Sequence, residues 1–259
     1  TLVSYPLYDT CVGIEMTESN AAPQEHSDEC SQRVAQSPVL KMEPAHFWVC
    51  TYPYFQSTLV LVPVSPENLP QSVSLHLYDP DGATLNEITL SCGELSPMMF
   101  EIDPFLEAAK LESGLKHAHL KIESDAPIKT FVRYHTAESA CVVGPCVTAV
   151  DGLSRFFPLT VSENRENVFV VLNSSPEKVS VRCRLYRGNR KPEHILSIPA
   201  FGVRLVSIES VFREYFDPGE KLIQQCYVRI GTRDHEPLAV QLLERNILEG
   251  DKSLFSLVG

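Results

Sequence analysis

The sequence predicts an all-β protein built from two tandem antiparallel β-sandwiches behind an N-terminal extension. In the segment at 72–85, SVSLHLYDPDGATL, apolar and polar residues alternate up to a turn that contains Pro and Gly. The pattern returns at 180–193 as SVRCRLYRGNRKPE. No stretch shows a long helical period, so no helix is expected to cover a sheet. Because each strand must bury one apolar face, the strands must pack sheet against sheet, and a doubled unit gives two sandwiches.

Length and charge narrow the classes of function. A chain of 259 residues exceeds the usual size of one domain, which agrees with two. Its 22 basic and 33 acidic residues give a net charge of −11, which opposes attraction to nucleic acid and to anionic lipid. No run reaches the ~18 consecutive apolar residues of a membrane helix, so we expect no membrane insertion. We expect a cytoplasmic protein, with a secreted protein whose signal peptide has been removed as the alternative.

The extension at 1–45 differs in composition from the rest of the chain. After a short apolar start, the sequence becomes rich in Glu, Ser, Asn and Gln and shows no periodicity. This composition predicts an acidic loop at 15–31 that joins an added edge strand to the first sandwich.

The first sandwich is predicted over 46–145. Aromatic and β-branched residues, broken by turn residues, predict its strands at 46–52, 57–64, 72–78, 84–90, 98–102, 117–123 and 128–135. A short helical segment is expected at 104–111. In the turn that follows Tyr78, Pro80 fixes its own φ and Gly82 supplies a positive φ. We interpret 138–152 as the link between the sandwiches.

The second sandwich is predicted over 153–250 in the same order. Its strands are expected at 166–172, 181–186, 195–199, 204–208, 227–230 and 236–240, with a helical turn at 211–216. Short strands at this spacing are typical of immunoglobulin-like sandwiches.

The eight cysteines do not require disulfides, because a chain of this length can bury an adequate core without them. We therefore expect reduced thiols. Cys141 and Cys146 are spaced more widely than a zinc knuckle, so a local disulfide and two unrelated thiols are the alternatives to zinc. The sequon that begins at Asn173 does not decide the compartment.

Several segments of both repeats resemble a known family. In the first repeat they are the aromatic strand with Trp48, STLVLV at 57–62, VSLHLYDPDG at 73–82 and IESDAPIKTFVRYHT at 122–136. In the second repeat they are KPEHILSIPAFGVRLVSIESVF at 191–212 and EPLAVQ at 236–241. These segments resemble the soluble sensory rhodopsin transducer proteins.

The resemblance covers 46–136 and 153–246. It implies a β-sandwich fold and a non-enzymatic binding role. Members of that family are single domains that assemble as oligomers, whereas this chain is duplicated and strongly acidic. We therefore do not carry over the rhodopsin partner.

A metal site is the sharpest chemical hypothesis. His117 and His119 are two apart on a predicted strand and so share a face, and His135 is expected on the neighbouring strand as a third ligand. The alternative is a set of surface or half-buried histidines, and the second repeat has Gln225 and Tyr227 at the positions of the first two.

No pattern of nucleophilic catalysis or of a phosphate-binding loop occurs in the chain. The paired carboxylates Asp79 and Asp81 are explained by the turn that they form. We expect no catalytic residues and no cofactor.

A basic run in the second repeat is the other candidate site. On a strand, Arg182, Arg184 and Tyr186 face one way, and a hairpin turn follows them with Arg187, Arg190 and Lys191. This pattern is compatible with a site for an anion or an acidic partner, although such a row is more often a solvated strand face that protects a sheet edge.

Aromatic residues gather in the opening strands of the first repeat. Such residues can form a sugar-binding platform, but core packing is the default interpretation, above all for the single tryptophan. The cluster consists of Phe47, Trp48, Tyr52, Tyr54 and Phe55.

We therefore expect a non-catalytic binding or adaptor protein for a protein or carbohydrate ligand, with its oligomeric state open. The alternatives are a metal-dependent enzyme that uses His117, His119 and His135 and a structural module of a surface assembly.

Overall fold

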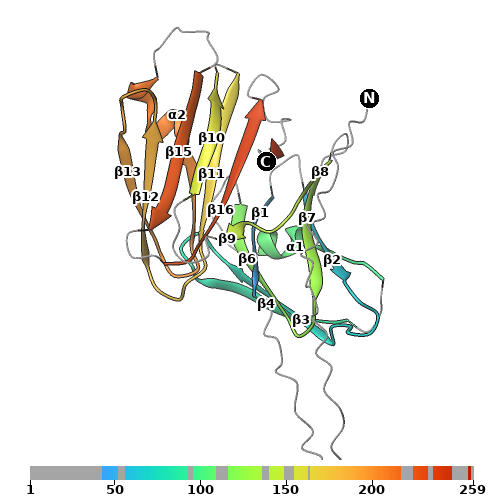
Figure 1. The fold of residues 1–259 in the computed structure, drawn as a ribbon. Coiled ribbons are helices and arrows are strands. Elements are labelled where there is room, and N and C mark those ends of the chain that lie inside the picture. Colours follow the sequence, from blue (N-terminus) through green and yellow to red (C-terminus); the bar gives the residue numbers. More distant parts are fainter. Residues whose placement is uncertain are drawn as a thin grey trace, which may run out of the picture. The chain divides into compact units, whose positions relative to one another are not determined.

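Over its described residues the chain forms an all-β protein with four antiparallel sheets, which confirms the all-β part of the predicted fold class (Figure 1). The computed structural model describes residues 43–51, 56–92, 96–108, 116–135, 140–148, 155–162, 164–216, 224–232, 236–246 and 256–257. The predicted acidic loop, Tyr52, Tyr54 and Phe55 lie outside the described residues. Within the described part of the chain, no helix is long and apolar enough to cross a membrane.

Two sheets come from the first half of the chain. One has the order β1 (Ala45–Thr51), β6 (Lys116–Ser124), β3 (Ser72–Tyr78) and β4 (Thr84–Ser91). The other has the order β5 (Met98–Glu101), β2 (Gln56–Pro63), β7 (Ile128–His135) and β8 (Ala140–Val143). The short helix α1 (Asp103–Ala108) follows β5.

The other two sheets come mostly from the second half. One has the order β10 (Arg155–Val161), β15 (Gln224–Thr232), β12 (Val179–Tyr186) and β13 (Glu193–Ile198). The other has the order β14 (Val203–Ser207), β11 (Arg165–Asn173), β16 (Leu238–Asn246) and β17 (Ser256–Leu257), and β9 (Val147–Thr148) also pairs with β16. Helix α2 (Ile208–Val211) and a 3-10 turn (Arg213–Tyr215) follow β14.

The internal repeat is visible in the strand order. The order β1–β6–β3–β4 recurs as β10–β15–β12–β13, and the registers also correspond. Tyr78 of β3 lies opposite His119 of β6, and Tyr186 of β12 lies opposite Tyr227 of β15.

Apart from shifts at the ends of elements, three features of the chain differ from the prediction. The segment interpreted as a link contains β8 and β9, which join two different sheets. Strand β10 was not predicted, because Pro158 interrupts an otherwise aromatic and apolar stretch. Strand β17 was not predicted either, and it consists of only two residues that pair with β16.

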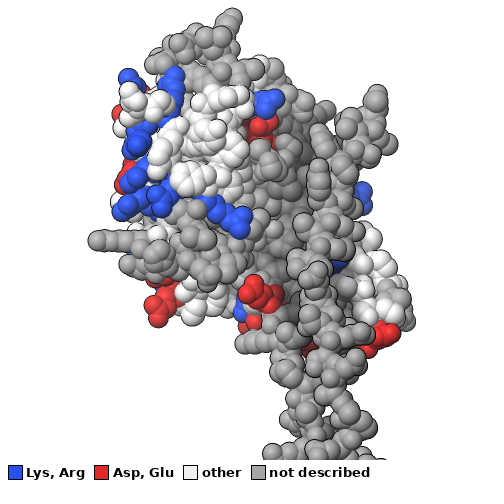
Figure 2. All heavy atoms as spheres, viewed as in Figure 1, with Lys and Arg blue, Asp and Glu red and all other residues white. Residues whose placement is uncertain are grey.

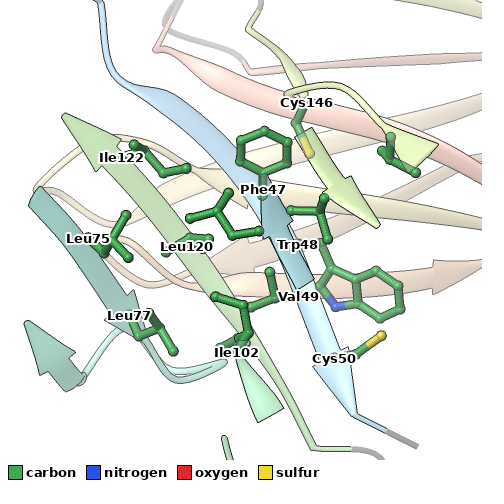
Figure 3. Packing of buried hydrophobic residues seen from close by; sticks show 14 of the residues in the cluster. Phe47, Trp48, Val49, Cys50, Leu75, Leu77, Ile102, Leu120, Ile122 and Cys146 are labelled. Carbon is green, nitrogen blue, oxygen red and sulfur yellow. The ribbon is translucent and has the colours of Figure 1, made fainter. Parts of the chain in front are cut away.

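The buried residues form two apolar clusters that meet at β11. The first contains Trp48, only 2 % exposed, so the predicted burial of the single tryptophan is confirmed. Figure 3 shows Trp48 and Cys50 projecting from β1 within this cluster, with Leu120 on β6 and Leu77 on β3. The first cluster also takes in residues of the second half, Val170, Leu172, Val203, Ala239 and Leu243.

The second cluster takes the alternate residues of β11. Phe169 and Val171 belong to it, whereas Val170 and Leu172 belong to the first. Since side chains alternate across a strand, β11 is buried on both faces. All the described residues accordingly belong to one compact unit.

The hairpin turn between β3 and β4 also contacts the second half. The carbonyl oxygen of Pro80 accepts hydrogen bonds from the Val203 amide at 3.1 Å and from the Arg204 guanidinium at 2.5 Å. Arg204 also pairs with Asp81 at 2.8 Å. Gly82 has φ +86°, and a Cβ there would lie 1.8 Å from the carbonyl oxygen of Ala200. The turn therefore needs glycine both for its backbone conformation and for this close approach.

Candidate binding surface

The basic run lies on and beside the outer face of β12. Arg182, Arg184 and Tyr186 alternate along the strand with buried residues of the second cluster. The hairpin turn that follows is closed by reciprocal backbone hydrogen bonds between Arg187 and Arg190, at 3.2 and 3.0 Å. Arg187 also donates a hydrogen bond to the carbonyl of Tyr215, and Arg190 is exposed.

Neighbouring strands add aromatic and apolar side chains that the sequence interpretation missed. Tyr227 of β15 is 55 % exposed and lies opposite Tyr186, and Arg229 lies opposite both Arg184 and Phe156 of β10. Phe156 and Ile195, the latter on β13, are also exposed. The signal in the sequence was the alternation within 224–232, which places Tyr227 and Arg229 on the same face of the strand.

We name this surface the arginine–tyrosine face. It is the outer face of β10–β15–β12–β13, and Figure 2 shows Lys and Arg side chains gathered over these strands with uncharged residues between them. Its members are Phe156, Arg182, Arg184, Tyr186, Ile195, Tyr227 and Arg229.

Positive charge is concentrated at the centre of this face. Arg184 and Arg229 are like charges directly opposite each other, an unfavourable arrangement in which the carboxylate of Glu193 offsets the charge of Arg184. Hydrogen bonds from Arg184 and then from Arg229 lower the pKa of the Tyr186 phenol. Glu193 pairs with Arg184 and lies 3.5 Å from Arg182. No acidic partner of Arg229 occurs among the described residues.

Cations also lie over two of the aromatic rings. Arg229 is 5.6 Å from the ring centre of Phe156, and the ammonium of Lys191 is 5.8 Å from that of Tyr186. The face therefore presents guanidinium donors and flat rings side by side, a combination that suits an anionic partner with apolar or aromatic groups.

His117 and His119 lie on one face of β6, as the alternation predicted, but His119 uses both ring nitrogens in hydrogen bonds. Its Nδ1 donates to the carbonyl oxygen of Phe201 at 2.7 Å, and its Nε2 lies 2.8 Å from Nδ1 of His46. Because one nitrogen of His119 must donate to a carbonyl, the other accepts from His46 in the neutral pair. Neither nitrogen of His119 is free to bind a metal.

His135 does not lie on the strand beside His117 and His119. Strand β6 belongs to one sheet and β7 to another, because the chain crosses between layers at the turn after Ser124. Nε2 of His135 lies 3.2 Å from Oγ1 of Thr58. Over the part of the chain that the structure describes, no group of three or more His, Cys, Asp or Glu side chains could hold a metal ion.

The described cysteines, which include Cys141 and Cys146, are free thiols. Burial raises the pKa of Cys146 and of Cys183 to about 12, and that of Cys226 to about 11. These thiols are therefore protonated and poor nucleophiles near neutral pH.

The sequon asparagine is part of the fold. Asn173 is fully buried, and its side-chain amide donates hydrogen bonds to the carbonyls of Glu177 and Pro199 at 2.6 and 2.7 Å. In the folded protein this amide is not accessible for a glycan.

Comparison with known proteins gave no family assignment: no protein-family model matches the chain, and a search of curated proteins found no match.

Proposed function

We propose that the protein is a non-catalytic binding module of two tandem immunoglobulin-like β-sandwiches that recognises an acidic protein through the arginine–tyrosine face. The observation that carries this proposal is the Arg184–Arg229 pair, set among exposed aromatic rings on one face of a sheet. The recurring strand order supports the tandem arrangement. The resemblance to the sensory rhodopsin transducer proteins is in keeping with a binding role.

Composition and charge favour a protein as the partner. Arg and Tyr are enriched at protein interfaces and dominate their binding energy. The face is basic although the chain carries a net charge of −11, so electrostatic attraction would select an acidic partner. A neutral sugar is a poorer fit, because it offers no negative charge to the guanidinium groups of Arg184 and Arg229.

Binding of a fluorescent hexaglutamate peptide, measured by anisotropy at several salt concentrations, tests this function. We expect binding that weakens as salt rises, because the attraction is screened. The double charge reversal Arg184→Glu with Arg229→Glu should weaken binding about tenfold or more.

Lys129→Glu is the matched control, since Lys129 is exposed on β7 in a different sheet. It changes the charge in the same direction and should have a much smaller effect. Absence of hexaglutamate binding, or an equal loss per charge in the control, would overturn the proposed function.

A further inference from the structure

The first half carries a face that corresponds position by position to the arginine–tyrosine face. In β3 and β6, Tyr78 lies opposite His119 and His76 lies opposite Lys121. In β12 and β15, Tyr186 lies opposite Tyr227 and Arg184 lies opposite Arg229. The two faces therefore share their strand order and register but differ in side chains.

The next strands on either side correspond as well. His46 lies opposite Lys121, just as Phe156 lies opposite Arg229. On the other side Glu87 lies opposite His76, with 3.4 Å between the carboxylate and the ring nitrogen, where Glu193 pairs with Arg184.

In the first half this face is covered by a turn of the second half. Phe201, at the tip of that turn, has a positive φ of 54°. Its ring stacks on Tyr78 with 4.7 Å between ring centres, and its carbonyl oxygen accepts the hydrogen bond from His119. The ammonium of Lys121 lies 5.9 Å from the same ring. The first-half face thus binds a turn through one aromatic ring and one acceptor oxygen.

In the second half the corresponding positions are open. His119 is 0 % exposed, whereas Tyr227 is 55 % exposed. His46 is 5 % exposed, whereas Phe156 is 58 % exposed. The same arrangement of strands is therefore occupied in one half and available in the other.

We propose that the arginine–tyrosine face receives from its partner a turn that carries an aromatic side chain beside a carboxylate. The aromatic ring packs on Tyr186 and Tyr227, as Phe201 packs on Tyr78, and the carboxylate is held by Arg184 and Arg229. This inference rests on the proposed function and specifies the partner that the face accepts.

The changes between the two faces explain why the partner needs a carboxylate. Where the first half has His76 and Lys121, the second has two arginines, whose planar forks bind carboxylates through paired hydrogen bonds. Glu193 contacts Arg184, and among the described residues no ion pair joins it to Arg229, so the charge of Arg229 is left for a carboxylate of the partner. The Tyr186–Tyr227 pair supplies the surface on which an aromatic ring packs.

Three fluorescent peptides test the proposal with the full chain: hexaglutamate, and hexaglutamate with one central residue replaced by phenylalanine or by leucine. An aromatic pair contributes an energy equivalent to about two- to tenfold in affinity beyond simple burial. We expect the phenylalanine peptide to bind about two- to tenfold more tightly than the leucine peptide, measured by anisotropy.

Matched variants locate the two parts of the site. Tyr227→Thr should abolish the preference for phenylalanine, whereas Val142→Thr, a comparably exposed position on β8 in a different sheet, should retain it. Arg229→Gln should weaken all three peptides about tenfold, and Arg190→Gln, in the exposed hairpin turn, only slightly.

The outcomes separate the two proposals. If no peptide binds, the proposed function fails and this inference fails with it. If hexaglutamate binds but phenylalanine gives no advantage over leucine, the proposed function stands and this inference is overturned. If Arg229→Gln and Arg190→Gln lose equal affinity for the peptides, binding is spread over a basic surface, and the proposed carboxylate site is overturned.

Discussion

His46 and His119 form a neutral pair within the first half of the chain, and His119 also bonds to the second-half turn at Phe201. Burial is the main cause that lowers the pKa of His46 to about 3, with smaller contributions from His119 and Lys121. Burial also lowers the pKa of His119 to about 4, against the opposing effect of its hydrogen bond to Phe201. A charged pair would place two imidazolium rings in contact, so the docked turn at Phe201 requires the neutral forms.

Stability should therefore fall in acid. An unfolded histidine has a pKa near 6.5, so between pH 4 and 6.5 the unfolded state binds more protons than the folded state. The free energy of unfolding should decrease as pH drops through this window, by about 1.4 kcal/mol per pH unit for each such ring. His117, whose pKa burial lowers to about 4, adds to the effect. Urea unfolding at a series of pH values measures this slope.

The variant His119→Gln isolates one ring. Glutamine keeps a donor for the Phe201 carbonyl but does not titrate, so the slope should decrease by about 1.4 kcal/mol per pH unit. Stability at neutral pH should also fall, because the packing is imperfect. An unchanged slope between pH 4 and 6.5 would contradict the neutral pair.

At this scale the sequence predicted the direction of side chains better than their surroundings. Alternation correctly placed His117 with His119 and Arg182 with Arg184 on shared faces. The partner of His119 is Phe201, 82 residues further along the chain, and no local pattern indicates such a contact. Tyr227 and Arg229 were missed for a related reason, since their role depends on the strand beside them.

Among the elements, the two hairpin turns of the repeat have different surroundings. Gly82, in the turn between β3 and β4, lies against the backbone of Ala200. Gly188, with φ +56° in the β12–β13 hairpin, lies in open space, and a Cβ added there would meet no heavy atom within 4 Å. Both glycines have a positive φ, but only at Gly82 does a neighbouring backbone also leave no room for a Cβ atom.

Replacement of both glycines by alanine separates these effects. Gly188→Ala should cost about 1–2 kcal/mol, the strain of a left-handed residue with a Cβ. Gly82→Ala should cost about 3 kcal/mol or more, because the turn must also move away from Ala200. Chemical denaturation measures both values, and equal costs would show that the contact between the halves adds nothing.

Elements with a clear alternation were predicted to within a few residues, such as β3, β7 and β12. Strands β8, β9 and β17 were not, because they are two to four residues long and exist through pairing with distant strands. Propensity within such short segments carries little information.

For the molecule as a whole, the important strand is β11. The run VFVVL at 168–172 is continuously apolar, which is typical of a strand buried on both faces. The sequence thus contained a signal of the shared core, although the repeat alone suggested two units joined by a link. Through β11 the first and second clusters are continuous, so we expect the halves to unfold together.

Trp48 allows a direct measurement of this coupling. It is the only tryptophan and belongs to the first cluster, whereas Phe212 is buried in the second. Phe212→Ala should cost about 3–5 kcal/mol and shift the Trp48 fluorescence transition in urea as far as the far-UV circular dichroism transition. A Trp48 transition left at its original midpoint, with a biphasic dichroism curve, would contradict a single cooperative core.

The buried thiols can report where the folded protein opens to solvent. Cys50 and Cys146 lie in the first cluster, and Cys183 and Cys226 lie in the second. Because all four are protonated and shielded from solvent in the folded protein, an alkylating reagent reaches each one only when its surroundings open. The rates at which these positions become labelled therefore record, residue by residue and without any engineered probe, how much local opening occurs in each half before the whole core unfolds.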